Sequence, residues 1–237
     1  MEHDHSPEAI AARLASGMKH NYLRDFVYGG IDGAVTTFAV VSGVVGAALD
    51  TKIILIMGAA NLLADGFSMA SSNFLGTKAE RDAHERLEAI ERRHIEEHPE
   101  GEKEEIRQII RSKGLDGEVL EHVVERITGD HDIWVRMMLA EEYGLPREIR
   151  SSWLAACSTF GSFLVCGLAP LLPFIFHVDH AFTIASILTG AVFFAIGSVK
   201  SLWSISGWGR SGLETLLVGA VAAALAYGAG VVLRGLA

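Results

Sequence analysis

Long apolar stretches alternate with a single charged block along this chain of 237 residues. Five of the stretches are long enough to form a helix across roughly 30 Å of hydrocarbon, which takes about 20 residues. They are residues 26–48, 53–75, 152–177, 181–199 and 215–233. Asp32 interrupts the first stretch and Asp65 the second, whereas the other three carry no charge. The pattern predicts an all-α integral membrane protein with five transmembrane helices.

The charged block is an insert at residues 76–150, between the second and third spans. Residues 78–98 contain no Gly or Pro, so the second span is expected to continue into the insert as one long helix. Pro99-Glu100-Gly101 is expected to break that helix. Apolar residues at helical spacing then predict three short amphipathic helices that form a small bundle. These helices cover residues 102–112, 117–128 and 130–143.

A separate amphipathic segment precedes the spans, over residues 1–25. Ser6-Pro7-Glu8 is typical of a helix start, and Ile10, Leu14 and Met18 follow it at intervals of four. Such a helix lies on a membrane surface or on the protein itself. The remaining predicted segments are the first two spans at 26–75, the helical insert at 76–150 and the last three spans at 151–237.

Charge is concentrated in the insert. It contains 20 Asp and Glu against 13 Lys and Arg, a net charge of −7, while the rest of the chain contains 9 and 7. Acidity of this degree favours cationic partners and argues against nucleic acid.

Basic residues near the span ends predict the orientation in the lipid bilayer. On one side lie Lys19, Arg24, Lys78, Arg81, Arg147, Arg150, Lys200 and Arg210. The other side has only Lys52, the turn from His177 to His180, and Arg234. The N-terminus and the insert are therefore expected in the cytosol, with the C-terminus across the membrane. We expect that membrane to be the cytoplasmic (inner) membrane, or a vacuolar-type membrane in a eukaryotic cell.

Asp32 is a candidate ion-binding residue inside the first span. A charge within the membrane costs at least about 2.5 kcal/mol on insertion scales, so Asp32 is expected to face protein, water or a cation. The alternative is an interfacial carboxylate that only reaches water. Gly29 and Gly33 beside it form a surface of small residues that a neighbouring helix can approach closely.

The second span carries Asn61, Asp65, Met69 and Asn73 at intervals of four. This spacing is expected to place them along one stripe of the helix. Their oxygen and sulfur atoms suit a borderline-soft divalent ion. Alternatively, Met69 is ordinary packing and the two Asn residues join helices by hydrogen bonds.

Thioethers and carboxylates also occur together in the insert. Met137, Met138 and Glu141 lie within about one helical turn. Thioether sulfur is a poor ligand for Mg²⁺ and Ca²⁺ but suits Fe²⁺ and softer ions, so a site built here is expected to discriminate against hard cations.

Two pairs of glutamates support the same interpretation. Glu88 and Glu91 are three residues apart, as are Glu102 and Glu105, so each pair shares a helix face. The repulsion within a pair becomes favourable only when a cation bridges it. The alternative is a set of solvated faces balanced by neighbouring Lys and Arg.

Three motifs together resemble the vacuolar iron transporter family. They are Tyr28-Gly29-Gly30-Ile31-Asp32-Gly33, Ala64-Asp65-Gly66-Phe67-Ser68-Met69-Ala70 and the Met-Met-x-x-Glu of the insert. The resemblance runs from about Tyr22 to Gly230. It implies a homodimer of five-span subunits that exchanges cytosolic Fe²⁺, and often Mn²⁺, for protons along a path at the dimer axis.

The resemblance also implies roles for individual residues. Asp32 and Met69 match the residues that line the ion path. The insert residues that match its metal-gathering ligands are Glu88, Glu91, Glu102, Glu105, Met137, Met138 and Glu141, with His84 or His94 as possible replacements for a glutamate. Many members carry Gly-Glu where this chain has Ser72-Asn73, so Asp65 is expected to take over the missing carboxylate.

These observations predict a transporter in which the insert captures Fe²⁺ or Mn²⁺ and passes it to Asp32, then to Asp65 and Met69. Protons return through the same carboxylates, because a carboxylate removed from water binds either a proton or a cation. The alternative is a membrane-anchored iron sensor or store, although such an anchor has no use for Asp65.

An enzyme is not expected, nor is a catalytic cofactor. Di-iron enzymes in helix bundles use two Glu-x-x-His pairs. Glu91 and His94 supply one copy, but the second is lacking because Glu118 is followed by Glu121, with His122 one residue late.

Overall fold

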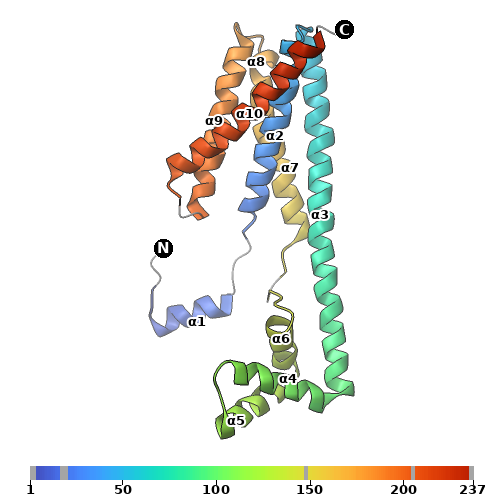
Figure 1. The fold of residues 1–237 in the computed structure, drawn as a ribbon, viewed down its shortest axis with the longest axis vertical. Coiled ribbons are helices and arrows are strands. Elements are labelled where there is room, and N and C mark those ends of the chain that lie inside the picture. Colours follow the sequence, from blue (N-terminus) through green and yellow to red (C-terminus); the bar gives the residue numbers. More distant parts are fainter. Residues whose placement is uncertain (1–3, 17–20, 147–148, 204–205, 235–237) are drawn as a thin grey trace. The chain divides into compact units, whose positions relative to one another are not determined.

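The computed structural model describes residues 4–16, 21–146, 149–203 and 206–234, and within these ranges the regular structure is helical, with no strand. Five helical segments of the described chain are long and apolar enough to cross a membrane. They are Leu23–Gly46, Thr51–Glu97, Ser152–Ile175, Ala181–Lys200 and Trp208–Arg234. The prediction of an all-α chain with five spans is confirmed in this respect (Figure 1).

The chain forms two compact units. One comprises Asn21–Gly76 and the chain from Ser151 onward, and is called the membrane unit below. The other contains α1 (Pro7–Ser16) and Thr77–Arg150, and is called the insert unit. Helix α3 (Thr51–Glu97) is one continuous helix of 47 residues that supplies both units, as the absence of helix breakers predicts (Figure 1).

In the membrane unit, α2 (Leu23–Gly46) packs against α7 (Ser152–Leu168), α9 (Ala181–Lys200) and α10 (Trp208–Arg234). The contact with α7 is backbone to backbone. A Cβ atom added to Gly29 or Gly33 would lie 2.3 Å from the carbonyl oxygen of Thr159 or Phe163, respectively. The surface of small residues beside Asp32 is therefore the face on which α7 docks.

Gly33→Ala is expected to destabilise the protein, and Gly43→Ala on the same helix is the matched control. The new methyl group at Gly33 has no space, because its nearest neighbour is the backbone of Phe163, whereas the Cβ at Gly43 meets only the Ala226 oxygen at 3.8 Å. Overpacking costs about 1–3 kcal/mol, while Ala gains about 1 kcal/mol of helix propensity over Gly. Thermal unfolding in detergent should show a lower midpoint for Gly33→Ala and an unchanged or higher one for Gly43→Ala. Equal midpoints would contradict the close approach.

The insert unit is built from the end of α3, α4 (Pro99–Ser112), α5 (Gly117–Thr128) and α6 (His131–Glu141). All four of these helices contribute buried side chains to the hydrophobic core of the insert unit. They are Ile95, Ile106, Ile110, Leu120, Val124, Trp134, Val135, Met138 and Leu139. Asp130 caps α6 by accepting hydrogen bonds at 3.0 Å from the backbone N–H groups of Asp132 and Ile133.

Several predicted boundaries were wrong, each for a local reason. The expected break at residues 99–101 is limited to His98, because Pro99 occupies the first turn of α4, where its missing N–H is not needed. The fifth span begins at Trp208 rather than at 215, and Arg210 and Glu214 form an i,i+4 ion pair of 3.2 Å in its first turns. The third span, by contrast, matches its predicted range of 152–177: it runs over Ser152–Ile175 and consists of α7, η1 (Ala169–Leu171) and α8 (Leu172–Ile175).

Other boundaries moved by a few residues. The first span is α2, which begins at Leu23, and the predicted helix at 130–143 is α6, which ends at Glu141. Met18 of the amphipathic segment lies outside the described residues, as do Lys19 and Arg147, which contributed to the predicted orientation.

Candidate functional site

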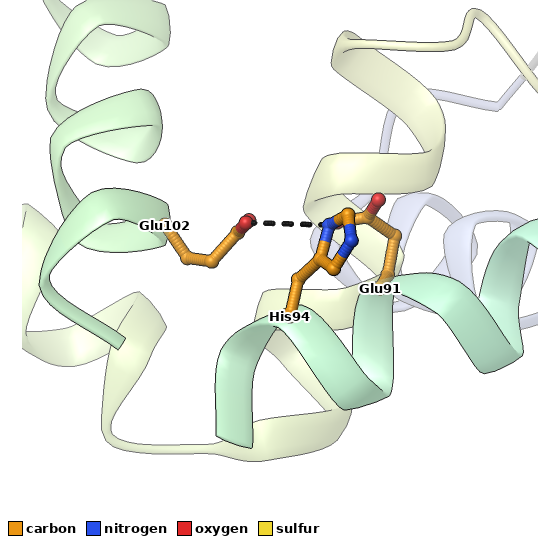
Figure 2. Close-up of side chains that lie close together, drawn as sticks. All are labelled: Glu91, His94 and Glu102. Carbon is orange, nitrogen blue, oxygen red and sulfur yellow. Dashed lines mark ion pairs between the residues drawn. The ribbon is translucent and has the colours of Figure 1, made fainter. Parts of the chain in front are cut away.

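A carboxylate and imidazole cluster lies in the insert unit where α3 meets α4. Glu91 and His94 project from the last turns of α3, and Glu102 projects from the first turns of α4 (Figure 2). One ligand atom from each residue lies within 4.8 Å of the others. The Nδ1 atom of His94 is 3.6 Å from Oε1 of Glu102. The chain turns at His98, between the two helices, and this brings their ends together.

Two buried carboxylate oxygens in this cluster have no hydrogen-bond partner among the described residues. Glu91 is 1% exposed and Glu102 is 6% exposed. The hydroxyl of Tyr143 donates to Oε1 of Glu91 at 2.8 Å, but Oε2 of Glu91 and Oε2 of Glu102 are unsatisfied. Buried unpaired carboxylate oxygens are costly, and a bound cation would satisfy both.

Further acids surround the cluster. Burial raises the pKa of Glu102 to about 7, and the negative charges of Glu105 and Glu91 add to this effect while His94 opposes it. Burial also raises the pKa of Glu142, again assisted by Glu91 and Glu105. Four carboxylates and one imidazole therefore act on one another in the insert, and such a set favours a divalent cation.

Metal affinity at this cluster is expected to fall below pH 7. Because the pKa of Glu102 is raised to about 7, the carboxyl group holds a proton below that pH, and a metal must displace it. Displacement of a single proton lowers the affinity about tenfold per pH unit. Anaerobic calorimetric titration of the full-length protein with Fe²⁺ at several pH values measures this slope, and Glu102→Gln should flatten it. If the slope is unchanged in Glu102→Gln, the pH dependence of metal affinity arises from another titratable group.

The other sequence-predicted ligands of the insert are placed differently. Oε1 of Glu88 accepts two hydrogen bonds from Arg92, at 2.8 and 3.1 Å. Glu141 pairs with Lys113 at 2.7 Å. Met138 is fully buried in the hydrophobic core, and Met137 is partly buried against that core. The structure thus brings together Glu91, His94 and Glu102, with Glu105 close enough to act on their charges.

Glu142 and Tyr143 were missed from the sequence. Glu142 follows Met138 by four residues, so it lies on the same side of α6 as Met138 although its own side chain is exposed, whereas Glu141 follows Met137 on the neighbouring side. Recognising Met138 as a core residue would have favoured Glu142 over Glu141 as a member of the cluster.

In the membrane unit, the first two spans place two carboxylates near each other. Asp32 on α2 is half-buried, Asp65 on α3 is exposed, and the two repel each other electrostatically. Asp32 also lines a hollow of about 760 Å³ together with Arg24 and Lys200. Met69 packs against the hydrophobic core of the membrane unit.

The two asparagines of the predicted stripe join helices. Nδ2 of Asn61 donates to Oγ1 of Thr36 on α2 at 3.0 Å. Nδ2 of Asn73 donates to Oδ1 of Asp25 on α2 at 3.0 Å and to Oγ1 of Thr159 on α7 at 2.8 Å. These hydrogen bonds favour the alternative in which the asparagines are structural, and they reveal Asp25, only 6% exposed, as a buried acid that the sequence did not single out.

These features define a helical membrane protein with acids on its first two spans and a cluster of carboxylate and imidazole side chains in its insert. Comparison with known proteins gives the family: the model of the VIT family matches residues 23–231, so the chain belongs to that family. It is a family of transporters rather than of enzymes.

Three relatives indicate the extent of the similarity. Vacuolar iron transporter 2 of Oryza sativa subsp. japonica is 30% identical over 209 residues, which cover 87% of this chain and 85% of the relative. The vacuolar iron transporter of Toxoplasma gondii is 31% identical over 230 residues, 90% of this chain and 75% of the relative. Vacuolar iron transporter 1 of Eucalyptus grandis is 30% identical over 209 residues, 87% and 84% of the two chains.

Proposed function

We infer that this protein moves Fe²⁺, and also Mn²⁺, out of the cytosol in exchange for protons. The observation that carries the proposal is the cluster of Glu91, His94 and Glu102, in which two buried carboxylate oxygens have no partner among the described residues. Imidazole nitrogen and carboxylate oxygen are suitable ligands for both ions. The relatives named as vacuolar iron transporters support iron as the cargo.

The ion path in this proposal runs beside Asp32, Asp65 and Met69. The repulsion between the two aspartates is relieved when a cation lies between them. The hollow that reaches Asp32 supports access for a hydrated ion. Asn73 holds α3 against α2 and α7, and so positions Met69 one turn away.

The exposed face of α3 supports a homodimer. Leu63 and Phe67 are 64% and 67% exposed, and Asp65 is exposed between them. An acid facing lipid is costly, so a second subunit that covers this face would give Asp65 a protein or water-filled surrounding. The carboxylates of two subunits would then line a shared path.

Proton exchange follows from competition at the same carboxylates. A proton and a metal ion cannot occupy one carboxylate oxygen together, so release of metal on the acidic side accompanies protonation. In this proposal the acidic insert lies in the cytosol and collects metal there, while protons move across the membrane into the cytosol.

Uptake of Fe²⁺ into proteoliposomes tests the proposal. With an acidic lumen, uptake is expected to accelerate, and a pH-sensitive dye inside should report loss of lumenal protons as metal enters. Vesicles with a collapsed gradient are the control. Uptake that ignores the gradient would reject proton exchange, and the absence of any uptake would reject transport itself.

A further inference from the structure

Two basic side chains meet at one end of the membrane unit. Arg24 in the first turn of α2 and Lys200 in the last turn of α9 line the same hollow of about 760 Å³, although they lie far apart in the sequence. Both residues are exposed, and neither side chain forms an ion pair or a hydrogen bond with another described residue. The hollow therefore carries two uncompensated positive charges at the helix ends.

The other cations of the membrane unit do not form such a pair. Arg210 is held in an ion pair of 3.2 Å within α10. Lys52 lies in the first turn of α3 and Arg234 ends α10, and neither of them lines this hollow. Among the described residues of this unit, Arg24 and Lys200 are therefore the two cations that lie together without a carboxylate partner.

The lining of the hollow changes from basic to apolar along α2. Arg24, Val27, Tyr28 and Ile31 all line it, and their spacing of three and four residues places them on one face of the helix. Tyr28 is 70% exposed, which is typical of the aromatic residues at a membrane interface. A charged end followed by an apolar face fits an amphiphile, whose anionic head meets the cations and whose chain lies along the helix. Inorganic phosphate would use only the charged end.

Asp32 lines the same hollow but is compatible with an anionic head group. It follows Arg24 by eight residues, which corresponds to about 12 Å along a helix. Long Arg and Lys side chains extend their charged ends toward the membrane surface, and this increases the separation. A phosphate held by both cations therefore lies well away from the carboxylate.

An anionic lipid would also remove an obstacle to the ion path. In the proposed function a divalent cation enters this hollow to reach Asp32, and two uncompensated positive charges would repel it. A phosphate group beside Arg24 and Lys200 offsets that repulsion. This step rests on the proposed function, whereas the pair of cations and the apolar face do not.

We propose that this hollow binds one anionic phospholipid per subunit, with the phosphate between Arg24 and Lys200. One acyl chain lies along Val27, Tyr28 and Ile31. Basic pockets between membrane helices suit such head groups, because each Lys or Arg near the surface adds to the attraction for a negatively charged lipid. A zwitterionic phospholipid is held less tightly, since its own ammonium group cancels the charge of its phosphate.

Lipid binding by the full-length protein in detergent, without metal, tests the site. The protein is titrated with phosphatidylglycerol or with phosphatidylcholine that carries the same chains, and bound lipid is counted by native mass spectrometry. One phosphatidylglycerol per subunit is expected to bind at least about tenfold more tightly than phosphatidylcholine. Arg24→Gln/Lys200→Gln should remove this preference, and each single substitution should weaken it. Because metal is absent, the result does not depend on whether the protein transports metal.

Lys52→Gln/Arg210→Gln is the matched control, because it removes two positive charges of the membrane unit that lie outside the hollow. It should retain the preference for phosphatidylglycerol. Since Arg24 and Lys200 are exposed, their substitutions should leave the thermal unfolding midpoint unchanged, and the single variants serve if the double variant does not fold.

Three results would overturn the proposal. They are equal binding of the two lipids by wild type, an unchanged preference in every Arg24 and Lys200 variant, and an equal loss of preference in the control. Inorganic phosphate at the same concentration should not displace phosphatidylglycerol. Displacement would mean that the cations bind phosphate without the apolar face, which would also reject a lipid site.

Discussion

Asp32→Asn is expected to abolish metal transport while leaving metal binding by the insert intact. Asn matches Asp in size and still forms hydrogen bonds, so the substitution removes little besides the charge. The carboxylate of Asp32 faces a hollow and acts on Asp65 of the neighbouring helix, which makes it the acid of α2 best placed to meet a passing cation. If loss of the Asp32 charge weakens ion binding by only about 1.4 kcal/mol, the affinity already falls tenfold. The interaction energy of a charge that is removed from water is larger than this.

The experiment compares two aspartates, Asp32 within α2 and Asp50 in the turn that follows this helix. Asp50 lies between α2 and α3 and accepts a hydrogen bond from the backbone N–H of Lys52 at 2.7 Å, a role that Asn also fills. Fe²⁺ uptake into proteoliposomes should fall by at least about tenfold in Asp32→Asn, and should stay at the wild-type rate in Asp50→Asn. Calorimetric titration should show unchanged Fe²⁺ binding by the insert in both variants. Normal uptake in Asp32→Asn would remove this residue from the path.

The spans were predictable because membrane insertion is governed by length and apolar composition, both of which are read directly from sequence. The continuity of α3 was predictable for a similar reason, since residues 78–98 contain no Gly or Pro. The start of α10 was not, because Arg210 and Glu214 read as polar loop residues until they are seen to pair along a helix.

The polar stripe on α3 shows what a spacing of four can predict. Asn61, Asp65 and Asn73 all meet α2, where Thr36 and Asp25 accept hydrogen bonds from the two asparagines and Asp32 repels Asp65. The spacing therefore predicted a shared face of the helix. It did not predict that Asn73 also donates to Thr159 on α7, because that contact depends on how the helices pack.

The ligands of the insert depended on contacts that periodicity does not contain. The spacing places Glu102 and Glu105 on one face of α4, but it does not say which face of α3 turns toward α4. The turn of the chain at His98 makes that choice, because it brings Glu91 and His94 to Glu102 and leaves Glu88 with Arg92.

Glu102→Gln is expected to stabilise the metal-free protein and to abolish the stabilisation that metal provides. Burial and neighbouring acids raise the pKa of Glu102 to about 7. The folded state therefore binds this proton more tightly than the unfolded state, and stability falls as pH rises from the ordinary glutamate pKa of about 4.3 to about 7. A neutral Gln removes that loss. At pH 7.5 the metal-free variant should have a higher unfolding midpoint than wild type, and the difference should shrink toward pH 5.

Metal should reverse the order of stability, so that wild type becomes more stable than Glu102→Gln. A ligand at 100 times its Kd stabilises the folded state by about 2.7 kcal/mol, and wild type should gain this with Fe²⁺ or Mn²⁺ while Glu102→Gln gains little. Glu100→Gln is the control on the same helix, because the Glu100 side chain is 88% exposed and should change neither midpoint. Thermal unfolding with and without metal, under anaerobic conditions, measures all three proteins. If the metal-free Glu102→Gln protein is less stable than wild type at pH 7.5, the Glu102 carboxylate stabilises the fold. If it is more stable, as expected, the cluster of repelling acids destabilises the metal-free fold and is stabilised only when a cation binds to it.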